Sequence, residues 1–351
     1  MLTSPDDVVK RLAEDESQRT ARSRINAGNN EEDPISTYMN EPELDRRSSA
    51  PQSLWTKARS ASIRMEVKWS SNNNQRSLKI EEKTLTADKR KEVASTIRNV
   101  KRLQRDVSLK QKPDQGKTFH CISADKASSA FMKDGRFTAF ADWRFIHRAR
   151  LNLLPLNGIR GRNQFGDRLC RRCRRVNETL PHVLNHCMRH SAAIQNRHNS
   201  LMDRVKNTAQ FMHWEVIHEN QVIPGSNSTL RPDLVIKKGT DAIIIDATCP
   251  FENGEGAFEA AREEKTQKYA DLARFLGETY TNVKVEPFVV GSLGAYDPKN
   301  SSLTRRIATR AFTKTFKILC VADAIRWSRM IYIEHLTGAR QYEEEDRDAT
   351  R

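Results

Sequence analysis

Two aspartates border a pair of apolar segments in the second half of the chain. Asp233 precedes Leu234-Val235-Ile236, and Asp246 directly follows Ala242-Ile243-Ile244-Ile245. The Val- and Ile-rich segments predict two β-strands, and Gly239 between them predicts a tight turn. Antiparallel pairing of these strands would bring the two carboxylates to the same end of the hairpin. Because carboxylate oxygens suit hard divalent cations, the pair predicts a magnesium site.

The residues after the hairpin predict a helix over 255–276 that carries two lysines toward the sheet. Spacing by threes and fours places Lys265 and Lys268 on its sheet-facing side. The other residues of that side are Ala261, Leu272 and Leu276. A buried ammonium group needs a carboxylate or phosphate partner. Asp233 and Asp246 are the nearest carboxylates in the sequence, so we expect both acids and the lysines to share one site.

A second group of residues has the spacing of a metal-binding motif. Cys170 and Cys173 are separated by two residues, His182 follows after eight more, and Cys187 after another four. Zinc takes four thiolate or imidazole ligands in a tetrahedron, so we expect these residues to bind a structural Zn²⁺. The alternatives for the fourth ligand are His186 and, less favoured, His190 and His198.

The overall charge favours a polyanionic partner. The 351 residues include 60 Lys+Arg against 45 Asp+Glu, a net charge of +15, which indicates nucleic acid or an anionic membrane. The apolar segments are far shorter than the roughly 20 residues of a membrane-spanning helix, and the first residues do not resemble a secretory signal. We therefore expect nucleic acid and no membrane. The six cysteines, three of them near histidines, favour a reducing compartment.

Arginines gather before and within the cysteine motif. In so basic a chain we expect them to contact the phosphates of nucleic acid. The candidates are Arg148, Arg150, Arg160, Arg162, Arg171, Arg172, Arg174 and Arg175.

The hairpin and the helix together resemble the restriction-endonuclease-like PD-(D/E)xK nucleases. In that family two acids hold a metal that activates water, and a lysine adds positive charge. The usual lysine position, two residues after the second acid, is Thr248 here. A lysine moved to the next helix is similar to the endonuclease domain of site-specific LINE-type (non-LTR) retrotransposon proteins. That group combines Pro-Asp, a second acid and a K-x-x-K-Y helix, which match Pro232-Asp233, Asp246 and residues 265–269.

Two further segments are similar to the same retrotransposon proteins. Residues 143–158 look like the linker that follows their polymerase, and the Cys-Cys-His-Cys motif matches the zinc knuckle that precedes their nuclease. Their polymerase also requires a Tyr/Phe-x-Asp-Asp turn, which this sequence does not contain. The resemblance therefore implies the C-terminal part of such a polyprotein, or a truncated copy.

The resemblance implies a metal-dependent endonuclease located in the nucleus. Asp233 and Asp246 would hold catalytic Mg²⁺, and either Lys265 or Lys268 would stabilise the phosphate or orient water. The nick in duplex DNA would expose a 3′ hydroxyl that primes reverse transcription of the element RNA. The alternative is a non-catalytic DNA- or RNA-binding protein with a zinc knuckle on a degenerate nuclease scaffold. The DNA target and the oligomeric state are left open.

The fold class expected is α/β, a restriction-endonuclease-like mixed sheet flanked by helices. The expected organisation is a largely disordered segment (1–53), a mixed basic segment (54–127), a helical basic linker (128–166), a zinc knuckle (167–190), the nuclease core (191–300), a C-terminal helix (301–340) and a tail (341–351).

Overall fold

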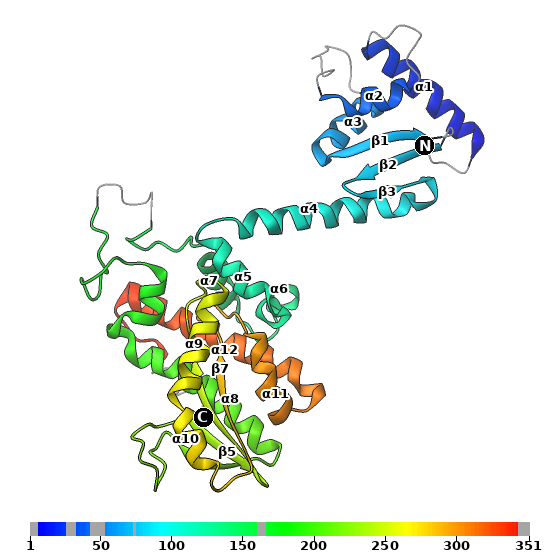
Figure 1. Ribbon diagram of the computed structural model, residues 1–351. Helices are drawn as coiled ribbons and strands as arrows, with labels where there is room; N and C mark the ends of the chain where they lie inside the picture. The colour runs from blue at the N-terminus through cyan, green and yellow to red at the C-terminus, as the bar shows by residue number, and fades with distance from the viewer. Residues whose placement is uncertain (1–5, 26–32, 43–52, 73–74, 160–165, 343–351) are drawn as a thin grey trace. The chain divides into compact units, whose positions relative to one another are not determined.

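The chain divides into two compact units, Met1–Ser108 and Leu109–Arg351. The computed structural model describes residues 6–25, 33–42, 53–72, 75–159 and 166–342 (Figure 1). Each unit has its own β-sheet and its own apolar core. The whole chain is a mixed α/β protein. None of the helices in the described ranges is long and apolar enough to cross a membrane.

The first unit packs helices on a small antiparallel sheet with the order β1-β2-β3. Its elements are α1 (Asp7–Ile25), α2 (Pro34–Asn40), α3 (Leu54–Met65), β1 (Val67–Asn72), β2 (Gln75–Ile80), β3 (Lys83–Leu85), the 3₁₀ turn η2 (Ala87–Glu92) and most of α4 (Val93–Lys110). Asp33 caps α2 by accepting a hydrogen bond from Ser36 N. The apolar side chains between the helices are Ile35, Tyr38, Met39 and Trp55.

Two of these helices contradict the expectation that residues 1–53 are largely disordered. Residues 7–25 and 34–40 are helical. The buried side of α1 consists of Ala13, Ser17 and Ala21, which are four residues apart. These small side chains contribute little hydrophobicity, so the polar composition of α1 does not reveal the side of the helix that packs.

The second unit contains every predicted chemical motif. Its elements are α5 (Gln115–Ser123), η3 (Lys126–Ser129), α6 (Phe131–Asp134), α7 (Phe140–Arg150), η4 (His182–His186), η5 (Met188–His190), α8 (Ser191–Phe211), β4 (Glu215–Glu219), β5 (Leu234–Lys238), β6 (Asp241–Thr248), α9 (Glu255–Lys268), α10 (Ala270–Leu276), β7 (Asn282–Val289), η6 (Pro298–Asn300), α11 (Ser301–Ile307) and α12 (Arg310–Thr337).

The sheet of the second unit has the strand order β4-β5-β6-β7. The pairs β4–β5 and β5–β6 are antiparallel, whereas β6 and β7 run parallel. The predicted hairpin is confirmed: Leu234 pairs with Ile245, and Gly239 in the turn has a φ of 60°. Glycine adopts this left-handed conformation without the steric cost that a side chain would add.

Helices cover both faces of this sheet, because side chains alternate along each strand. One face packs into the main core with α8 and α12, through Leu234, Ile236, Ile243 and Ile245. The other face packs on α10 and the residue before it, through Val235 and Ile244 against Tyr269, Leu272 and Leu276. The hairpin is therefore held between two helical layers, which fixes the position of both its ends.

Two predicted single helices are each divided in the structure. The predicted helix 255–276 is broken at Tyr269, which has a φ of −104° and separates α9 from α10. The predicted C-terminal helix 301–340 is broken at Ala308, which is extended, and Thr309 then caps α12 through Phe312 N. In both cases tertiary packing or capping overrides helix propensity. Residues 343–351 of the predicted tail lie outside the described residues.

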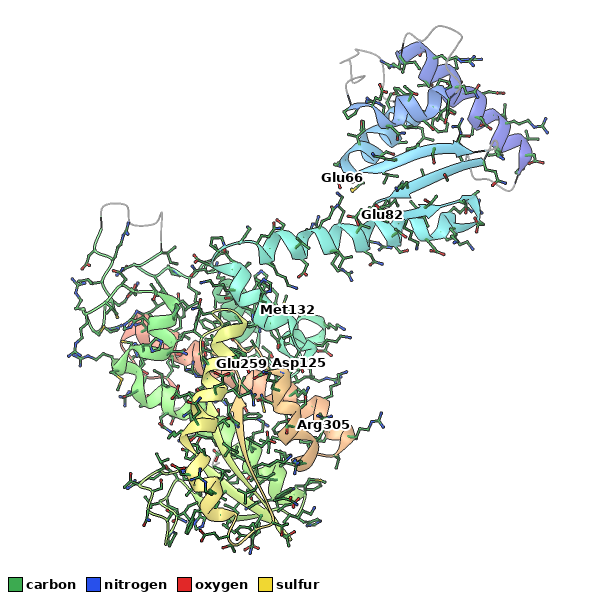
Figure 2. All side chains as sticks on the ribbon, in the orientation of Figure 1. Glu66, Glu82, Asp125, Met132, Glu259 and Arg305 are labelled. Carbon is green, nitrogen blue, oxygen red and sulfur yellow. The ribbon has the colours of Figure 1, made fainter. Side chains whose placement is uncertain are left out.

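The N-terminal half of α12 is tied to the helical segment that precedes α7. Asp125, labelled in Figure 2, caps η3 through Ala127 N and pairs with Lys317 Nζ at 2.8 Å. Among its described residues, the predicted helical linker 128–166 is helical up to Arg150, and residues 151–159 form turns and irregular structure. Residues 160–165 of this prediction lie outside the described residues.

Candidate functional site

The two predicted acids lie at the same end of the hairpin, opposite the Gly239 turn. Asp233 immediately precedes β5, and its Oδ2 accepts a hydrogen bond of 2.7 Å from Ala247 N, next to Asp246 on β6. Asp246 is buried within the sheet, with only 4% of its side chain exposed, whereas 18% of the Asp233 side chain is exposed. One carboxylate is thus open toward solvent and the other is held inside.

The α9 helix brings both predicted lysines to Asp246. Lys265 Nζ lies 2.7 Å from Asp246 Oδ1, and Lys268 Nζ lies 3.9 Å from Asp246 Oδ2. Lys265 is mostly buried, with 19% of its side chain exposed, against 36% for Lys268. The Lys268 ammonium also lies 4.7 Å from the centre of the Tyr269 ring, a cation–π contact. The contact of Lys265 with Asp246 is therefore shorter and less exposed to solvent than that of Lys268.

Tyr269, which is not among the predicted site residues, completes the surroundings of Asp246. Its side chain is fully buried, and its hydroxyl donates to Asp246 Oδ2 at 2.5 Å. Burial and the charge of Asp246 raise the pKa of Tyr269 far above its usual range. The phenol therefore stays protonated and remains a hydrogen-bond donor. The Tyr at the end of the K-x-x-K-Y motif was the available signal, but helix periodicity favoured Lys268 for the inward position.

His198 on α8 is a second residue of the site that sequence reasoning missed. Its Nε2 lies 2.8 Å from Asp233 Oδ2. Burial by itself would lower the pKa of His198, but the hydrogen bond to Asp233 and its charge raise it above the usual value. Sequence spacing predicts His198 only as a less favoured alternative zinc ligand. In the structure His198 contacts Asp233 instead, and no local pattern in the sequence predicts that contact.

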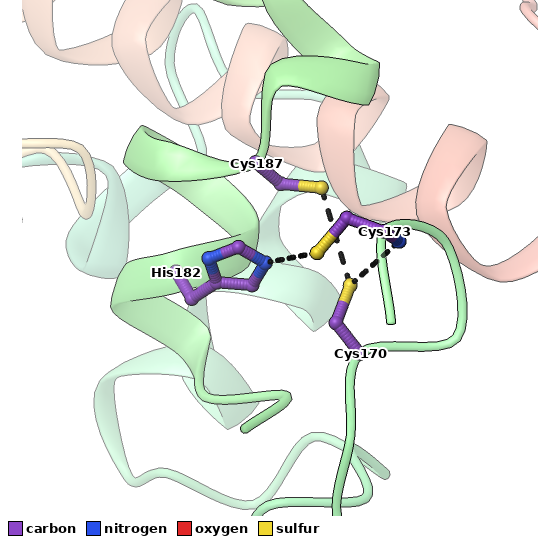
Figure 3. Close-up of side chains that lie close together, drawn as sticks. All are labelled: Cys170, Cys173, His182 and Cys187. Atoms are coloured by element: carbon purple, nitrogen blue, oxygen red, sulfur yellow. Dashed lines mark hydrogen bonds between the residues drawn. The ribbon is translucent and has the colours of Figure 1, made fainter. Parts of the chain in front are cut away.

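The four residues of the cysteine motif converge in a separate cluster (Figure 3). Their ligand atoms all lie within 4.8 Å of one another. Cys170 Sγ is 4.0 Å from Cys187 Sγ, and Cys173 Sγ is 3.3 Å from His182 Nε2. In a tetrahedral site with the usual Zn–S distance, two sulfurs lie roughly 3.8 Å apart. Three thiols and one imidazole gathered this closely are a ligand set suited to zinc.

Turns and a short helical segment position the cluster. Cys170 and Cys173 lie on one tight turn, in which Arg174 N donates to Cys170 O. His182 begins the π-helical turn η4, and Cys187 ends it. Burial lowers the pKa of His182, which favours the neutral imidazole that binds metal, and raises the pKa of the Cys187 thiol to about 12. A bound cation would instead lower the pKa of the Cys187 thiol, because it stabilises the thiolate.

None of the alternative histidines belongs to the cysteine cluster in the described part of the chain. His190 instead contacts His335 Nδ1 on α12 through its Nε2 at 3.0 Å. The other nitrogen of His335 is 2.8 Å from the buried carboxylate of Glu178. These contacts attach the cluster to α12 from within the core.

Several of the predicted nucleic-acid contacts have structural partners instead. The Arg150 prediction is wrong: its side chain is buried, and its guanidinium donates to the carbonyls of Leu293 and Ser128. Burial lowers the pKa of Arg150 to about 10. A buried guanidinium that is bonded to carbonyls holds the fold together and cannot reach a phosphate.

The other predicted arginines divide into three sets. Arg171 forms an ion pair with Glu178 at 2.7 Å, Arg172 donates to His335 O at 2.6 Å, and Arg174 pairs with Asp167. The side chains of Arg148 and Arg175 are exposed and form no ion pair or hydrogen bond with the described residues. The remaining two, Arg160 and Arg162, lie outside the described residues.

Comparison with known proteins relates this chain to retrotransposons. The chain is 29% identical over 200 residues to the "Retrovirus-related Pol polyprotein from type-1 retrotransposable element R2" of Nasonia vitripennis. It is 30% identical over 197 residues to a protein of the same description from Popillia japonica. The chain is homologous to Pol polyproteins of R2 retrotransposable elements. No family model matches the chain.

The R2 relatives are longer than this chain. Each match covers 54% of the chain, but only 19% of the Nasonia polyprotein and 40% of the Popillia polyprotein. The matched part of the chain thus spans less than half the length of either relative. The similarity supports the predicted link to LINE-type retrotransposons.

Proposed function

We propose that the second unit is a metal-dependent DNA endonuclease with a restriction-endonuclease-like fold that nicks duplex DNA at a retrotransposon target site. The observation that carries this proposal is the convergence of Asp233, Asp246 and Lys265 at one end of the hairpin. Three separate elements supply them, namely the segment before β5, the strand β6 and the helix α9. Homology to R2 Pol polyproteins provides independent support.

The two carboxylates would hold Mg²⁺, since hard oxygen donors suit this ion. When bound, magnesium would lower the pKa of a water molecule and offset charge on the scissile phosphate. The protein's own groups prepare the site. The Ala247 N–H and His198 orient Asp233 through its Oδ2, which leaves Oδ1 for the cation. Tyr269 orients Asp246 through its Oδ2, and Lys265 contacts the other oxygen, Oδ1.

Lys265 would place its ammonium beside the phosphate as negative charge develops there. Water oxygen attacks phosphorus, the bond from phosphorus to the 3′ oxygen breaks, and that oxygen leaves with a proton as a 3′ hydroxyl. The products are this hydroxyl and a 5′ phosphate. In the proposed context the hydroxyl primes reverse transcription of the element RNA in the nucleus, by a polymerase domain outside this sequence.

The cysteine cluster would have a structural role. Zn²⁺ bound by Cys170, Cys173, His182 and Cys187 would hold the zinc knuckle (167–190) in its folded conformation next to α12. Among the predicted arginines that the structure describes, the exposed Arg148 and Arg175 best suit contact with the DNA phosphates.

Nicking of a supercoiled plasmid in Mg²⁺ tests the proposal. Asp233→Asn and Asp246→Asn should each lower the nicking rate by about three orders of magnitude or more while DNA binding is retained. The matched control is Asp241→Asn, because Asp241 lies on the same strand at the opposite, turn end and bonds Asn282. Equal rates for all three variants would contradict the proposal.

Nucleic-acid binding without hydrolysis is the second candidate function. It is favoured by the three donors already grouped around Asp246, namely Lys265, Lys268 and Tyr269, which compete with a cation for its oxygens. Thr248, which stands where the family usually has a lysine, also favours binding without hydrolysis. This alternative predicts DNA binding by the intact chain with no nicking in either Mg²⁺ or Mn²⁺.

A further inference from the structure

Three aromatic rings are stacked along α7: Phe140 and His147 are exposed, and Trp143 between them is partly buried against the main core. The ring centres of Phe140 and Trp143 are 5.9 Å apart with their planes within 8°, and those of Trp143 and His147 are 5.3 Å apart with planes within 4°. The residues are three and four positions apart, so they share one side of the helix. Phe140, at one end of the stack, is 72% exposed. We name Phe140, Trp143 and His147 the aromatic ladder.

The opposite side of α7 anchors the helix, so the ladder sits on a rigid support. Phe145, Ile146 and Ala149 are buried in the main core, and the Phe145 ring lies 5.4 Å from that of Tyr332 on α12. Asp142 pairs with Arg329 Nε at 2.5 Å, which adds a second link to α12. The exposed phenyl ring of Phe140 therefore contributes little to holding α7 in place. A single exposed phenyl ring is common on protein surfaces, but Phe140 differs from such residues because it ends a stack of rings.

A row of positive charge runs beside the ladder. Arg144 follows Trp143, and Arg148 follows His147, so the two arginines are four residues apart on a neighbouring stripe of the helix. Both side chains are exposed, and neither guanidinium has an ion pair or hydrogen bond in the described ranges. The helix α7 thus presents aromatic rings, which can stack on bases, next to two guanidiniums, which can contact phosphates.

We propose that this surface of α7 binds single-stranded DNA. Unpaired bases stack on aromatic rings, whereas the bases of a duplex are already stacked inside it and present no free face. A base would extend the ladder at the exposed Phe140, and Arg144 and Arg148 would contact the phosphates alongside. The choice of DNA over RNA rests on the proposed nicking function, since a nick frees a strand end that can separate from its complement. The stacking geometry itself does not depend on that function.

Anisotropy of a fluorescently labelled oligothymidine, titrated with the full chain without added Mg²⁺, tests the proposal. Phe140→Ala should weaken binding by about 5- to 150-fold, the range for loss of one stacked base, and Phe140→Trp should restore it. The matched control is Phe211→Ala, which removes another exposed phenyl ring, 76% accessible, from α8. Equal binding by the two alanine variants would overturn the proposal.

Salt dependence separates the two kinds of contact. Replacing Arg144 or Arg148 by glutamine should lower the slope of log affinity against log salt by about 0.7 for each lost phosphate contact. Phe140→Ala should leave the slope unchanged. A slope that falls in Phe140→Ala but not in the arginine variants would contradict the assignment of rings to bases.

Two further binding measurements, with oligouridine and with duplex DNA, identify the ligand. Oligouridine should bind more weakly than oligothymidine, and a blunt duplex should bind equally to the parent protein and to Phe140→Ala. Equal affinity for the two oligonucleotides, or the same loss with duplex as with single strand, would overturn the proposal. Asp233→Asn should abolish nicking but retain oligothymidine binding, so a failure of the ladder is distinguishable from a failure of the nuclease.

Discussion

The imidazole of His198 lies 2.8 Å from the carboxylate of Asp233, although the two residues are 35 positions apart in the chain. The helix α8 supplies the histidine, and the start of β5 supplies the acid. Because Ala247 N bonds the same oxygen, Asp233 Oδ2 is held by two groups from two different elements. His198 is therefore a positioning residue for the acid that is open to solvent.

Replacing His198 should impair catalysis more than binding. His198→Ala should lower kcat for plasmid nicking by about 10- to 100-fold, the usual cost of losing a residue that orients a metal ligand, with KM little changed. His198→Gln, which can still donate a hydrogen bond, should recover part of the rate. His218→Ala is the control, since that side chain on β4 contacts Gln221 rather than the site. A change in KM alone would show that His198 acts on DNA binding.

The two lysines of α9 should differ in importance. Lys265 is closer to Asp246 and less exposed than Lys268, so its charge acts in a drier environment where electrostatic effects are stronger. Lys265→Ala should lower kcat by about 10²- to 10³-fold, whereas Lys268→Ala should lower it by about 10-fold or less. Single-turnover nicking at saturating DNA measures both. The reverse order would assign the principal catalytic charge to Lys268.

Loss of a cysteine ligand should release zinc and destabilise the second unit. Cys173→Ser and His182→Ala should each reduce bound zinc, measured by mass spectrometry of the metal, from one equivalent toward zero and lower Tm. Cys320→Ala, at a buried cysteine of α12 outside the cluster, should keep its zinc even if it is less stable. Retention of a full equivalent of zinc by both ligand variants would place the metal elsewhere.

Glu252 should give stability a dependence on pH. It is fully buried and accepts hydrogen bonds from Leu293 N and Ala295 N. Burial raises the pKa of Glu252 from 4.5 to about 7, against the opposing effect of these bonds and of Arg150. Between these two values the folded protein keeps a proton that the unfolded chain has lost. The contribution of Glu252 to the free energy of unfolding therefore falls as pH rises through this window.

Urea unfolding of the parent and of Glu252→Gln between pH 4.5 and 7.5 measures this effect. The parent should lose up to about 3 kcal/mol relative to the variant as pH rises across the window. Parallel curves for the two proteins would show that Glu252 titrates normally in the folded state.

The sequence alone determined the parts of the site whose geometry is local. Two β-branched segments and Gly239 specify a hairpin, and a hairpin with a short turn necessarily brings Asp233 and Asp246 to one end. Lys265 follows from helical periodicity, because inward positions recur every three or four residues. The spacing of Cys170 and Cys173 likewise specifies one turn that presents two sulfur atoms.

Only the tertiary structure decided which distant residues join these local units. The contact of His198 with Asp233 depends on how α8 crosses the sheet, and the hydroxyl of Tyr269 reaches Asp246 because α9 and α10 are separated at that residue. Arg150 had the sequence context of a nucleic-acid contact, yet packing buried it against Leu293. Spacing rules describe neighbours along one helix or hairpin, whereas these contacts depend on the packing of whole layers and on the burial that results.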